Sequence, residues 1–362
     1  MIVNVRPAAD RCPGLLRPHR AEDGLVVRLR IPGGQTRSST LLALTQLART
    51  LQLTSRGNLQ LRGIDEQDLP ALTDRIGELG LLPSASHELV RNIVASPLTG
   101  VTPGRPDLRS LIVALDQAIC AEPELADLPG RFLFAVDDGS ADVWSLAFDV
   151  GYRAIDADHG LLSLGRASGL SPAEASGRVI RSTAAPAEMV AIATEFVRAL
   201  RISRPVWRVW ELVDFRRDLR PPQNGRETSA GLTPPLGAVS GAASVGVPLS
   251  FLTSAQAAAV DDAAGGGPVV VTPWRTLIIP AAAPKLDALR TTGLITESHS
   301  PWSKITACVG APCCAKSVID TRTLAEEIAQ RRPGPSRLVH VSGCERRCGA
   351  PVADHDEFVG AR

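Results

Sequence analysis

The sequence contains no apolar run that approaches the roughly 20 residues an α-helix needs to span a bilayer. Its first residues, MIVNVRPAADRCPG, carry charges where a secretory signal would carry its apolar stretch. We therefore expect a cytoplasmic protein with no membrane partner. Because thiols stay reduced in the cytosol, the seven cysteines are expected to bind a metal or do redox chemistry rather than form disulfides.

The sequence also lacks an excess of charge of either sign. Lysine and arginine number 39 and aspartate and glutamate number 38, which gives a net charge of +1. Such a chain has no bulk field to recruit nucleic acid or an anionic membrane, so any anion must be held by locally clustered arginines. Small molecules are the expected partners.

A strand and helix pattern occupies the N-terminal quarter. Residues 24–34 (GLVVRLRIPGG) alternate like a strand, and residues 38–51 carry leucines at helical spacing behind a Ser/Thr cap. Residues 51–64 (LQLTSRGNLQLRGI) predict a second strand, and residues 69–82 predict a second helix. The order is therefore strand, helix, strand, helix.

The same order recurs after residues 214–243, which are rich in Pro, Gly, Ser and Arg and are expected to form a linker. Residues 245–295 again predict strand, helix, strand, helix. The two copies align without a gap, with Thr54, Leu59 and Leu61 matching Thr272, Leu277 and Ile279. The matched order favours an internal duplication over a chance similarity between two α/β units.

The copies differ in their arginines. The first copy has Arg30, Arg56 and Arg62 where the second has Gly246, Trp274 and Pro280. Guanidinium groups suit carboxylates, because two parallel N–H bonds match two oxygens. We therefore expect only the first copy to face an anionic ligand.

Five of the seven cysteines lie in the last sixth of the chain. Cys308 and Cys314 form C-x5-C, and Cys344 and Cys348 form C-x3-C after a predicted helix and strand that would bring the two loops together. Four converging thiolates suit a 4Fe–4S cluster. Structural zinc usually shows C-x2-C knuckles, which are absent, and a redox disulfide of Cys313 with Cys314 would leave the second pair unused. These remain the alternatives, together with a chance gathering of buried thiols.

These motifs resemble the sulfite/nitrite reductase superfamily. The resemblance rests on the two cysteine pairs, the RLRIPGG and LTSRGNLQLRGI segments, RNIVASP at residues 91–97 and the duplicated half-domain. It implies an α+β fold of two ferredoxin-like half-domains and two larger reductase lobes, with a 4Fe–4S cluster beside a modified tetrapyrrole. The implied boundaries are a first half-domain at 12–85, a first lobe at 88–213, the linker, a second half-domain at 244–297 and a shortened second lobe carrying the cluster at 298–362.

Within the superfamily, the chain resembles the precorrin-3B synthase family of aerobic cobalamin biosynthesis most. The motifs are CPG at 12–14, ELVRNIVASPLTG, LPGRFLFAVDDG at 128–139, ACVGAPCCAKS and VHVSGCERRCGAP. In that family dioxygen hydroxylates precorrin-3A at a meso carbon and a γ-lactone closes, with an electron donor as a further partner. The resemblance implies ligation of the cluster by the four paired cysteines, a second, mononuclear non-haem iron, and substrate contacts from Arg30, Arg56, Arg62, Arg91, Asn58 and Arg131.

A siroheme-dependent sulfite or nitrite reductase is the second interpretation, in which Cys348 would also bridge to the siroheme iron. Reductases commonly carry a K-x-K pair to hold the inorganic anion, and the matching residues here are Arg131 and Leu133. Loss of one cation suits uncharged dioxygen better than sulfite. A non-catalytic iron–sulfur carrier is the third interpretation, but it gives the arginines no role. Neither His340 nor His355 forms a visible iron-binding triad, and DHDEFVGA near the C-terminus is the candidate for a closing strand.

Overall fold

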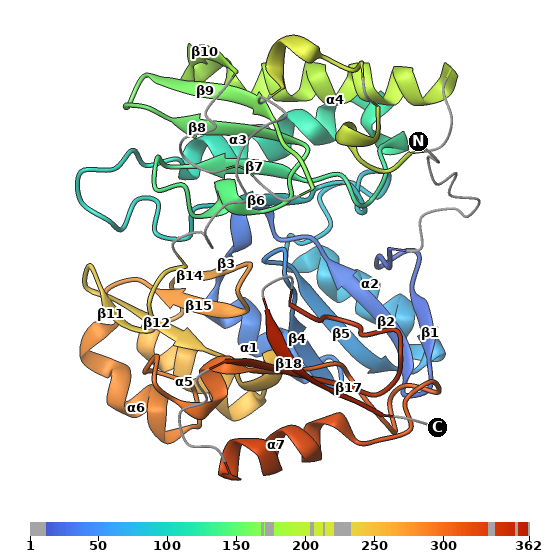
Figure 1. Ribbon diagram of the computed structural model, residues 1–362, viewed down its shortest axis with the longest axis vertical. Helices are drawn as coiled ribbons and strands as arrows, with labels where there is room; N and C mark the ends of the chain where they lie inside the picture. Colours follow the sequence, from blue (N-terminus) through green and yellow to red (C-terminus); the bar gives the residue numbers. More distant parts are fainter. Residues whose placement is uncertain are drawn as a thin grey trace.

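The computed structural model describes residues 12–167, 170, 177–202, 206–212, 214–220, 233–331, 337–351 and 354–360. Figure 1 shows an upper lobe, built from residues 93–202, above a lower region that contains the N-terminal, middle and C-terminal parts of the chain. Among the described residues, no helix has the length and apolarity to cross a bilayer.

The first sheet of the lower region takes four of its strands from the N-terminal part of the chain and one from further along. In order across the sheet, the strands are β1 (His19–Ala21), β2 (Gly24–Leu29), β5 (Leu59–Ile64), β4 (Thr50–Leu53) and β13 (Phe251–Leu252). Helices α1 (Ser38–Gln46) and α2 (Leu69–Glu78) bury Leu41, Leu44, Leu72 and Ile76 against it.

The second sheet has the same plan. Its strand order is β11 (Gly237–Val239), β12 (Ala242–Gly246), β15 (Thr276–Ile279), β14 (Pro268–Val271) and β3 (Gln35–Arg37), with helices α5 (Ser254–Ala264) and α6 (Leu286–Thr291). A capping box starts α5, because Thr253 Oγ1 accepts from Gln256 N and Gln256 Oε1 accepts from Thr253 N. Strand β11 lies inside the range predicted as linker, so this sheet begins before residue 244.

The two sheets confirm the predicted duplication. Leu29 pairs with Leu59 in the first sheet, and Val245 pairs with Leu277 in the second, so β2 and β5 correspond to β12 and β15 in the predicted register. The 3₁₀ turns Pro32–Gly34 (η1) and Pro248–Ser250 (η9) follow at matching positions. Each predicted second strand is in fact a hairpin: residues 51–64 form β4 and β5, and residues 268–280 form β14 and β15.

The halves are interlocked rather than separate. Strand β3 of the first half pairs with β14 of the second, and β13 of the second half pairs with β4 of the first. Ser38 at the start of α1 donates its hydroxyl to Asp261 Oδ1 on α5 at 2.7 Å. A single apolar core, containing Leu41, Leu61, Val260 and Leu277, runs through both halves. Neither half can therefore bury its core without the other.

The upper lobe is a five-stranded mixed sheet covered by two long helices. Its order is β10 (Arg178–Arg181), β9 (His159–Leu164), β8 (Val150–Ala154), β7 (Phe134–Asp137) and β6 (Ile93–Ala95), and its helices are α3 (Arg109–Ala121) and α4 (Ala185–Ile202). Strands β6, β7 and β8 are parallel. Parallel strands expose both faces to packing, which agrees with the uninterrupted burial of β6 and β7.

A smaller parallel sheet carries the C-terminal cysteines. It consists of β16 (Ile305–Ala307), β17 (Leu338–Ser342) and β18 (His355–Val359), with α7 (Thr321–Arg331) as the crossover helix. The candidate closing strand DHDEFVGA is therefore confirmed as β18. Further 3₁₀ turns lie at Glu66–Asp68, Pro123–Asp127, Val143–Ser145, Ser182–Ala184, Val209–Glu211, Arg217–Leu219, Ala283–Lys285 and Pro301–Lys304.

Candidate functional site

The two cysteine loops meet at one edge of the small parallel sheet. Cys308 follows β16, and Cys344 follows the neighbouring strand β17, so both loops leave from the carboxyl ends of adjacent parallel strands. The Cys308 amide donates to Val341 O at 2.9 Å, and the Gly343 amide donates to Cys308 Sγ at 3.2 Å. The backbone thus places a donor on the first sulfur before any ligand is bound.

The four paired cysteines lie within electrostatic range of one another. Partial burial raises the pKa of the Cys348 thiol, and the neighbouring Cys308, Cys344 and Cys314 raise it further. All four are reduced cysteines. Neighbouring thiolates that raise the pKa of Cys348 favour a bound cation, because a metal removes the repulsion between them.

Two glycines let the loops approach closely. A Cβ on Gly310 would lie 2.3 Å from Thr321 Oγ1, and one on Gly343 would lie 1.8 Å from Ser317 Oγ. Thr321 at the start of α7 donates to Cys308 O at 2.7 Å. The first cysteine loop is therefore fastened to the N-terminus of α7 and to the second loop.

No group of three or more His, Cys, Asp or Glu in the described part of the chain is arranged to hold a single metal ion. A tetrahedral zinc site with Zn–S bonds of about 2.3 Å would bring its sulfurs to about 3.8 Å from one another. A cubane cluster is larger and keeps its ligand sulfurs further apart. The donor set of four thiols with an amide on one sulfur fits the cluster, and the mononuclear iron stays a prediction.

Arg30 is the predicted contact residue whose surroundings suit an anion best. Its side chain is 2 % exposed and, within the described ranges, donates to the carbonyl oxygens of Leu89, Pro13 and Arg28. Burial lowers the pKa of Arg30 to about 9, and the positive charges of Arg28 and Arg56 also lower it. Among the described residues no carboxylate forms an ion pair with this guanidinium, although the charge of Glu88 opposes the lowering of its pKa. An anionic ligand would therefore supply a direct counter-charge.

Arg62 and Arg91, by contrast, already have carboxylate partners. Arg62 binds Asp23 through two bonds of 3.1 and 2.8 Å and also donates to Cys313 O at 3.3 Å. Arg91 binds Asp116 through two bonds of 2.7 Å. The prediction that these two arginines contact a ligand stays untested, but each guanidinium is held inside the protein.

The remaining predicted contact residues line the junction between the upper lobe and the first half. Arg56 donates to Gly130 O at 3.4 Å, and the guanidinium of the exposed Arg131 stacks 4.2 Å above the Trp207 ring. Asn58 accepts from Ile31 N at 2.9 Å and donates to Asn92 Oδ1 at 3.2 Å. Asn58 is 1 % exposed. It therefore shapes the junction from inside.

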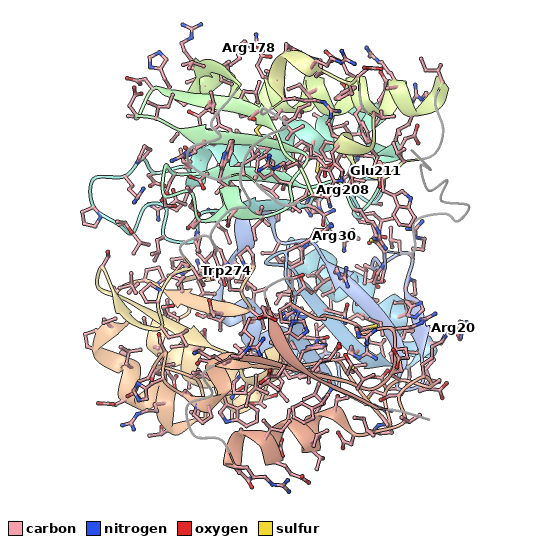
Figure 2. All side chains as sticks on the ribbon, viewed as in Figure 1. Arg20, Arg30, Arg178, Arg208, Glu211 and Trp274 are labelled. Atoms are coloured by element: carbon pink, nitrogen blue, oxygen red, sulfur yellow. The ribbon has the colours of Figure 1, made fainter. Side chains whose placement is uncertain are left out.

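Sequence reasoning missed other charged residues at this junction. Arg208 donates to Arg131 O and Ala147 O and lies 3.1 Å from Asp149 Oδ2. Burial lowers the pKa of Arg208 to about 10, against the opposing effect of Asp149. In Figure 2, Arg208 lies at the lower edge of the upper lobe and Arg30 lies below it. Arg208 stands among aromatic residues in RPVWRVWE, which gave no charge-pairing signal.

The CPG segment at residues 12–14 lies beside Arg30. Pro13 O accepts from Arg30, and the Glu88 carboxylate holds the following turn by accepting from Leu15 N at 2.6 Å and Leu16 N at 3.1 Å. The charge of the Cys12 thiol raises the pKa of Arg30, against the effect of burial. The N-terminal segment therefore forms one wall around this guanidinium.

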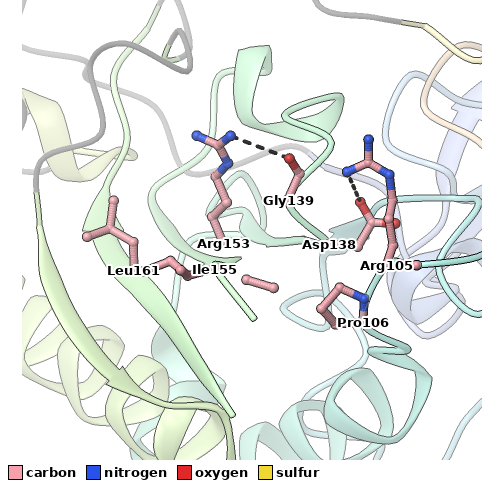
Figure 3. A pocket seen from close by; sticks show the side chains of 9 residues that line it. Arg105, Pro106, Asp138, Gly139, Arg153, Ile155 and Leu161 are labelled. Atoms are coloured by element: carbon pink, nitrogen blue, oxygen red, sulfur yellow. Dashed lines mark hydrogen bonds and ion pairs between the residues drawn. The ribbon is translucent and has the colours of Figure 1, made fainter. Parts of the chain in front are cut away.

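A pocket of about 490 Å³ lies elsewhere, in the upper lobe. Arg105, Asp138 and Arg153 contribute its polar lining (Figure 3). Arg105 Nη1 lies 3.9 Å from Asp138 Oδ1, and Arg153 donates to Gly139 O. None of the predicted contact residues or cysteines lines it.

Comparisons with known proteins agree with the fold. Residues 17–79 match the nitrite/sulfite reductase ferredoxin-like half domain. A precorrin-3B synthase from Sinorhizobium sp is 24% identical over 379 residues, covering 97% of this chain and 80% of that protein. A ferredoxin–nitrite reductase from Synechococcus elongatus is 26% identical over 404 residues, covering 93% and 76%.

The structure of the Mycobacterium tuberculosis NirA protein superposes with a TM-score of 0.67 at 23% identity, covering 88% of this chain and 68% of that one. The chain is thus similar to a precorrin-3B synthase and to nitrite reductases over nearly its whole length, and the predicted α+β class is confirmed.

Proposed function

We propose that this relative of the nitrite/sulfite reductases is a precorrin-3B synthase. The reaction would hydroxylate precorrin-3A at a meso carbon and close a γ-lactone from a carboxylate side chain of the substrate. One atom of dioxygen enters the product and the other leaves as water. Two electrons from an external donor and two protons complete the balance.

The observation that carries this proposal is the state of the residues that match the anion site of the reductases. Leu133 replaces the second cation and is 3 % exposed, packed in an apolar cluster with Val94, Trp144 and Phe148. Arg91 is neutralised by Asp116, and Arg131 stacks on Trp207. Of the matching cations only Arg30 stays buried without a carboxylate partner among the described residues. These residues therefore offer few cations to bind an inorganic oxyanion, whereas uncharged dioxygen needs no cation.

The arginines suit a tetrapyrrole that carries several carboxylate groups. Arg30 would bind one carboxylate with a charge-assisted hydrogen bond, and Arg56 would bind a neighbouring one from the hairpin turn of the first half. The Asn58 to Asn92 hydrogen bond and the Glu88 contacts hold the walls on which these arginines lie. The contacts between the arginines and the carboxylates would orient the ring so that one meso carbon faces the reaction centre.

Cys308, Cys314, Cys344 and Cys348 would hold a 4Fe–4S cluster, which supplies single electrons when it is bound. The Gly343 amide would stabilise the Cys308 sulfur in its charged form through the hydrogen bond already present. The described residues provide no ligand set for a mononuclear iron, so we derive no step from one.

The test uses protein purified without air. Iron and acid-labile sulfide would be measured together with absorption and paramagnetic resonance spectra, before and after addition of precorrin-3A and then oxygen. Near-equal iron and sulfide, no siroheme bands and oxygen-dependent conversion of precorrin-3A would support the synthase. Siroheme that co-purifies, with reduction of nitrite or sulfite, would favour the reductase to which several relatives are assigned. Absent iron would exclude both.

A further inference from the structure

The hairpin turns of the two halves have the same hydrogen-bond pattern. In the first, Thr54 O accepts from Gly57 N at 3.1 Å and Thr54 Oγ1 accepts from Asn58 N at 3.2 Å. In the second, Thr272 O accepts from Arg275 N at 3.0 Å and Thr272 Oγ1 accepts from Thr276 N at 3.3 Å. Arg275 therefore occupies the position of Gly57.

Arg275 adopts a backbone conformation that favours glycine. Its φ is +62°, close to the +66° of Gly57. A non-glycine residue in this region carries strain that persists only where the surroundings impose it, and such positions cluster at functional sites. At Gly57 a Cβ would lie 2.8 Å from Val271 O, so only the second turn has room for a side chain.

The Arg275 side chain reaches the second cysteine loop. Its Nη2 lies 3.7 Å from the place where a Cβ on Gly349, next to Cys348, would stand. The Arg275 charge also helps lower the pKa of the buried His340 on β17. The preceding residue, Trp274, packs against the apolar cluster of the upper lobe and anchors the turn between that lobe and the second sheet (Figure 2).

The side chain of Arg275 is half-buried. Burial lowers its pKa, with no acidic group acting against this effect. Within the ranges that the structure describes, the side chain has no hydrogen-bond or ion-pair partner, in contrast to Arg62 and Arg91. A strained backbone position that holds a partly buried cation beside the cysteine loop favours an anionic ligand there.

We propose that Arg275 binds a carboxylate of the tetrapyrrole substrate from the second half-domain, opposite Arg30 and Arg56. This inference rests on the proposed function, since it takes the polycarboxylated ring as the ligand. It differs from the expectation that only the first copy faces the anion, because the second copy lacks three arginines of the first but has one at the glycine position of its turn. The ring would then be held by guanidinium groups from both halves.

The experiment measures binding without turnover. Anaerobic, cluster-loaded protein would be titrated with sirohydrochlorin, a tetrapyrrole polycarboxylate, and with precorrin-3A, following absorption and fluorescence. Arg275→Gln should weaken binding 10- to 100-fold, as expected for loss of a charge-assisted hydrogen bond, and Arg275→Lys should restore part of it. The control Arg290→Gln, an exposed arginine paired with Asp287 on α6, should stay within twofold of wild type.

Arg275→Gly separates binding from folding. Glycine removes the strain at φ +62° and the buried charge, so its melting temperature should equal or exceed that of wild type while tetrapyrrole binding weakens. If wild type binds the tetrapyrrole and Arg275→Gln binds it with the same affinity, the inference about Arg275 is overturned and the proposed function is not. Tetrapyrrole binding by wild type without conversion of precorrin-3A would overturn the proposed function alone, and no binding by wild type would overturn both.

Discussion

Arg91 and Asp116 form a two-bond ion pair that ties the start of β6 to α3. Nε and Nη2 of Arg91 each lie 2.7 Å from a carboxylate oxygen, and the two side chains are 5 % and 18 % exposed. Leu81 O accepts a third, longer bond from Nη1. The pair therefore fixes the entry of the chain into the upper lobe, and it gives Arg91 a counter-charge inside the protein.

Replacing one partner of this pair should destabilise the fold. Arg91→Gln leaves the Asp116 carboxylate without its counter-charge, and we expect the free energy of unfolding to fall by about 3 kcal/mol. Tetrapyrrole affinity should change by less than about threefold in protein that remains folded. Denaturant unfolding and ligand titration measure the two effects.

The matched control is Arg75→Gln, which breaks the exposed pair of Arg75 with Glu78 on α2. Its effect on unfolding should stay below about 1 kcal/mol. A large loss of tetrapyrrole affinity in a stable Arg91→Gln protein would instead return Arg91 to the binding site.

Much of the architecture could be predicted because apolar periodicity and the repeat carry it. The gap-free alignment of Thr54 with Thr272 gave the register that β5 and β15 adopt. The hairpins were missed because apolar residues alternate on both sides of each turn and only five or four turn residues interrupt them. The exchange of β3 and β13 between sheets was also out of reach, because two- and three-residue strands have no periodicity of their own.

The sequence predicted which residue types form the candidate site better than it predicted their ion-pair partners. Cysteine spacing identified the two loops, and the arginines of the first copy stood out by comparison with the second. Their partners did not, because Asp23 lies 39 residues from Arg62 and Asp116 lies 25 residues from Arg91. Arg275 was missed because the comparison of the two copies considered arginines present in the first copy and absent from the second, and not the reverse. The left-handed turn position of Gly57 was the available signal.

Leu133 should behave as a core residue rather than as the lining of an open anion site. It lies beside Trp144 and Phe148 in the apolar cluster of the upper lobe. Leu133→Ala should lower the free energy of unfolding by about 2–4 kcal/mol, because a cavity replaces its methyl groups. The control Val113→Ala, on the exposed face of α3, should cost less than about 1 kcal/mol. A neutral Leu133→Ala would mean that the position faces solvent, which would weaken the argument against the reductase.

Asp142 should make stability fall as the pH rises from about 4 to about 7. Burial, followed by the charge of Asp137, raises the pKa of this carboxyl from 3.8 to about 7. The charge of Asp138 adds to this effect, and the hydrogen bond that Ser96 donates opposes it. Between these values the folded chain keeps a proton that the unfolded chain releases, so folding is favoured at the acidic end and this advantage is lost through pH 7.

Asp142→Asn should therefore be more stable than wild type at pH 8 by roughly 1–3 kcal/mol, with a flatter profile between pH 4 and 8. An amide oxygen can still accept the bonds that Ser96 Oγ and Val143 N now donate. Denaturant unfolding at a series of pH values provides the measurement, with Asp287→Asn as the exposed control. A destabilised Asp142→Asn at pH 8 would show that the carboxylate is needed in its charged form.

The four paired cysteines should be separable from the other three by their effect on iron. Serine is a poor iron ligand, so replacing Cys308, Cys314, Cys344 or Cys348 singly should lower iron and sulfide from about four per chain and bleach the visible absorption. Cys313→Ser and Cys120→Ser should keep the cluster. Cys313 lies outside the two predicted pairs, and its backbone carbonyl, which accepts from Arg62, is unchanged by the substitution. Cys120 lies on α3 in the upper lobe. Loss of iron in Cys313→Ser with retention in Cys314→Ser would exchange the roles of these neighbours. Zinc in place of iron throughout would exclude the cluster and, with it, the route by which electrons reach the substrate.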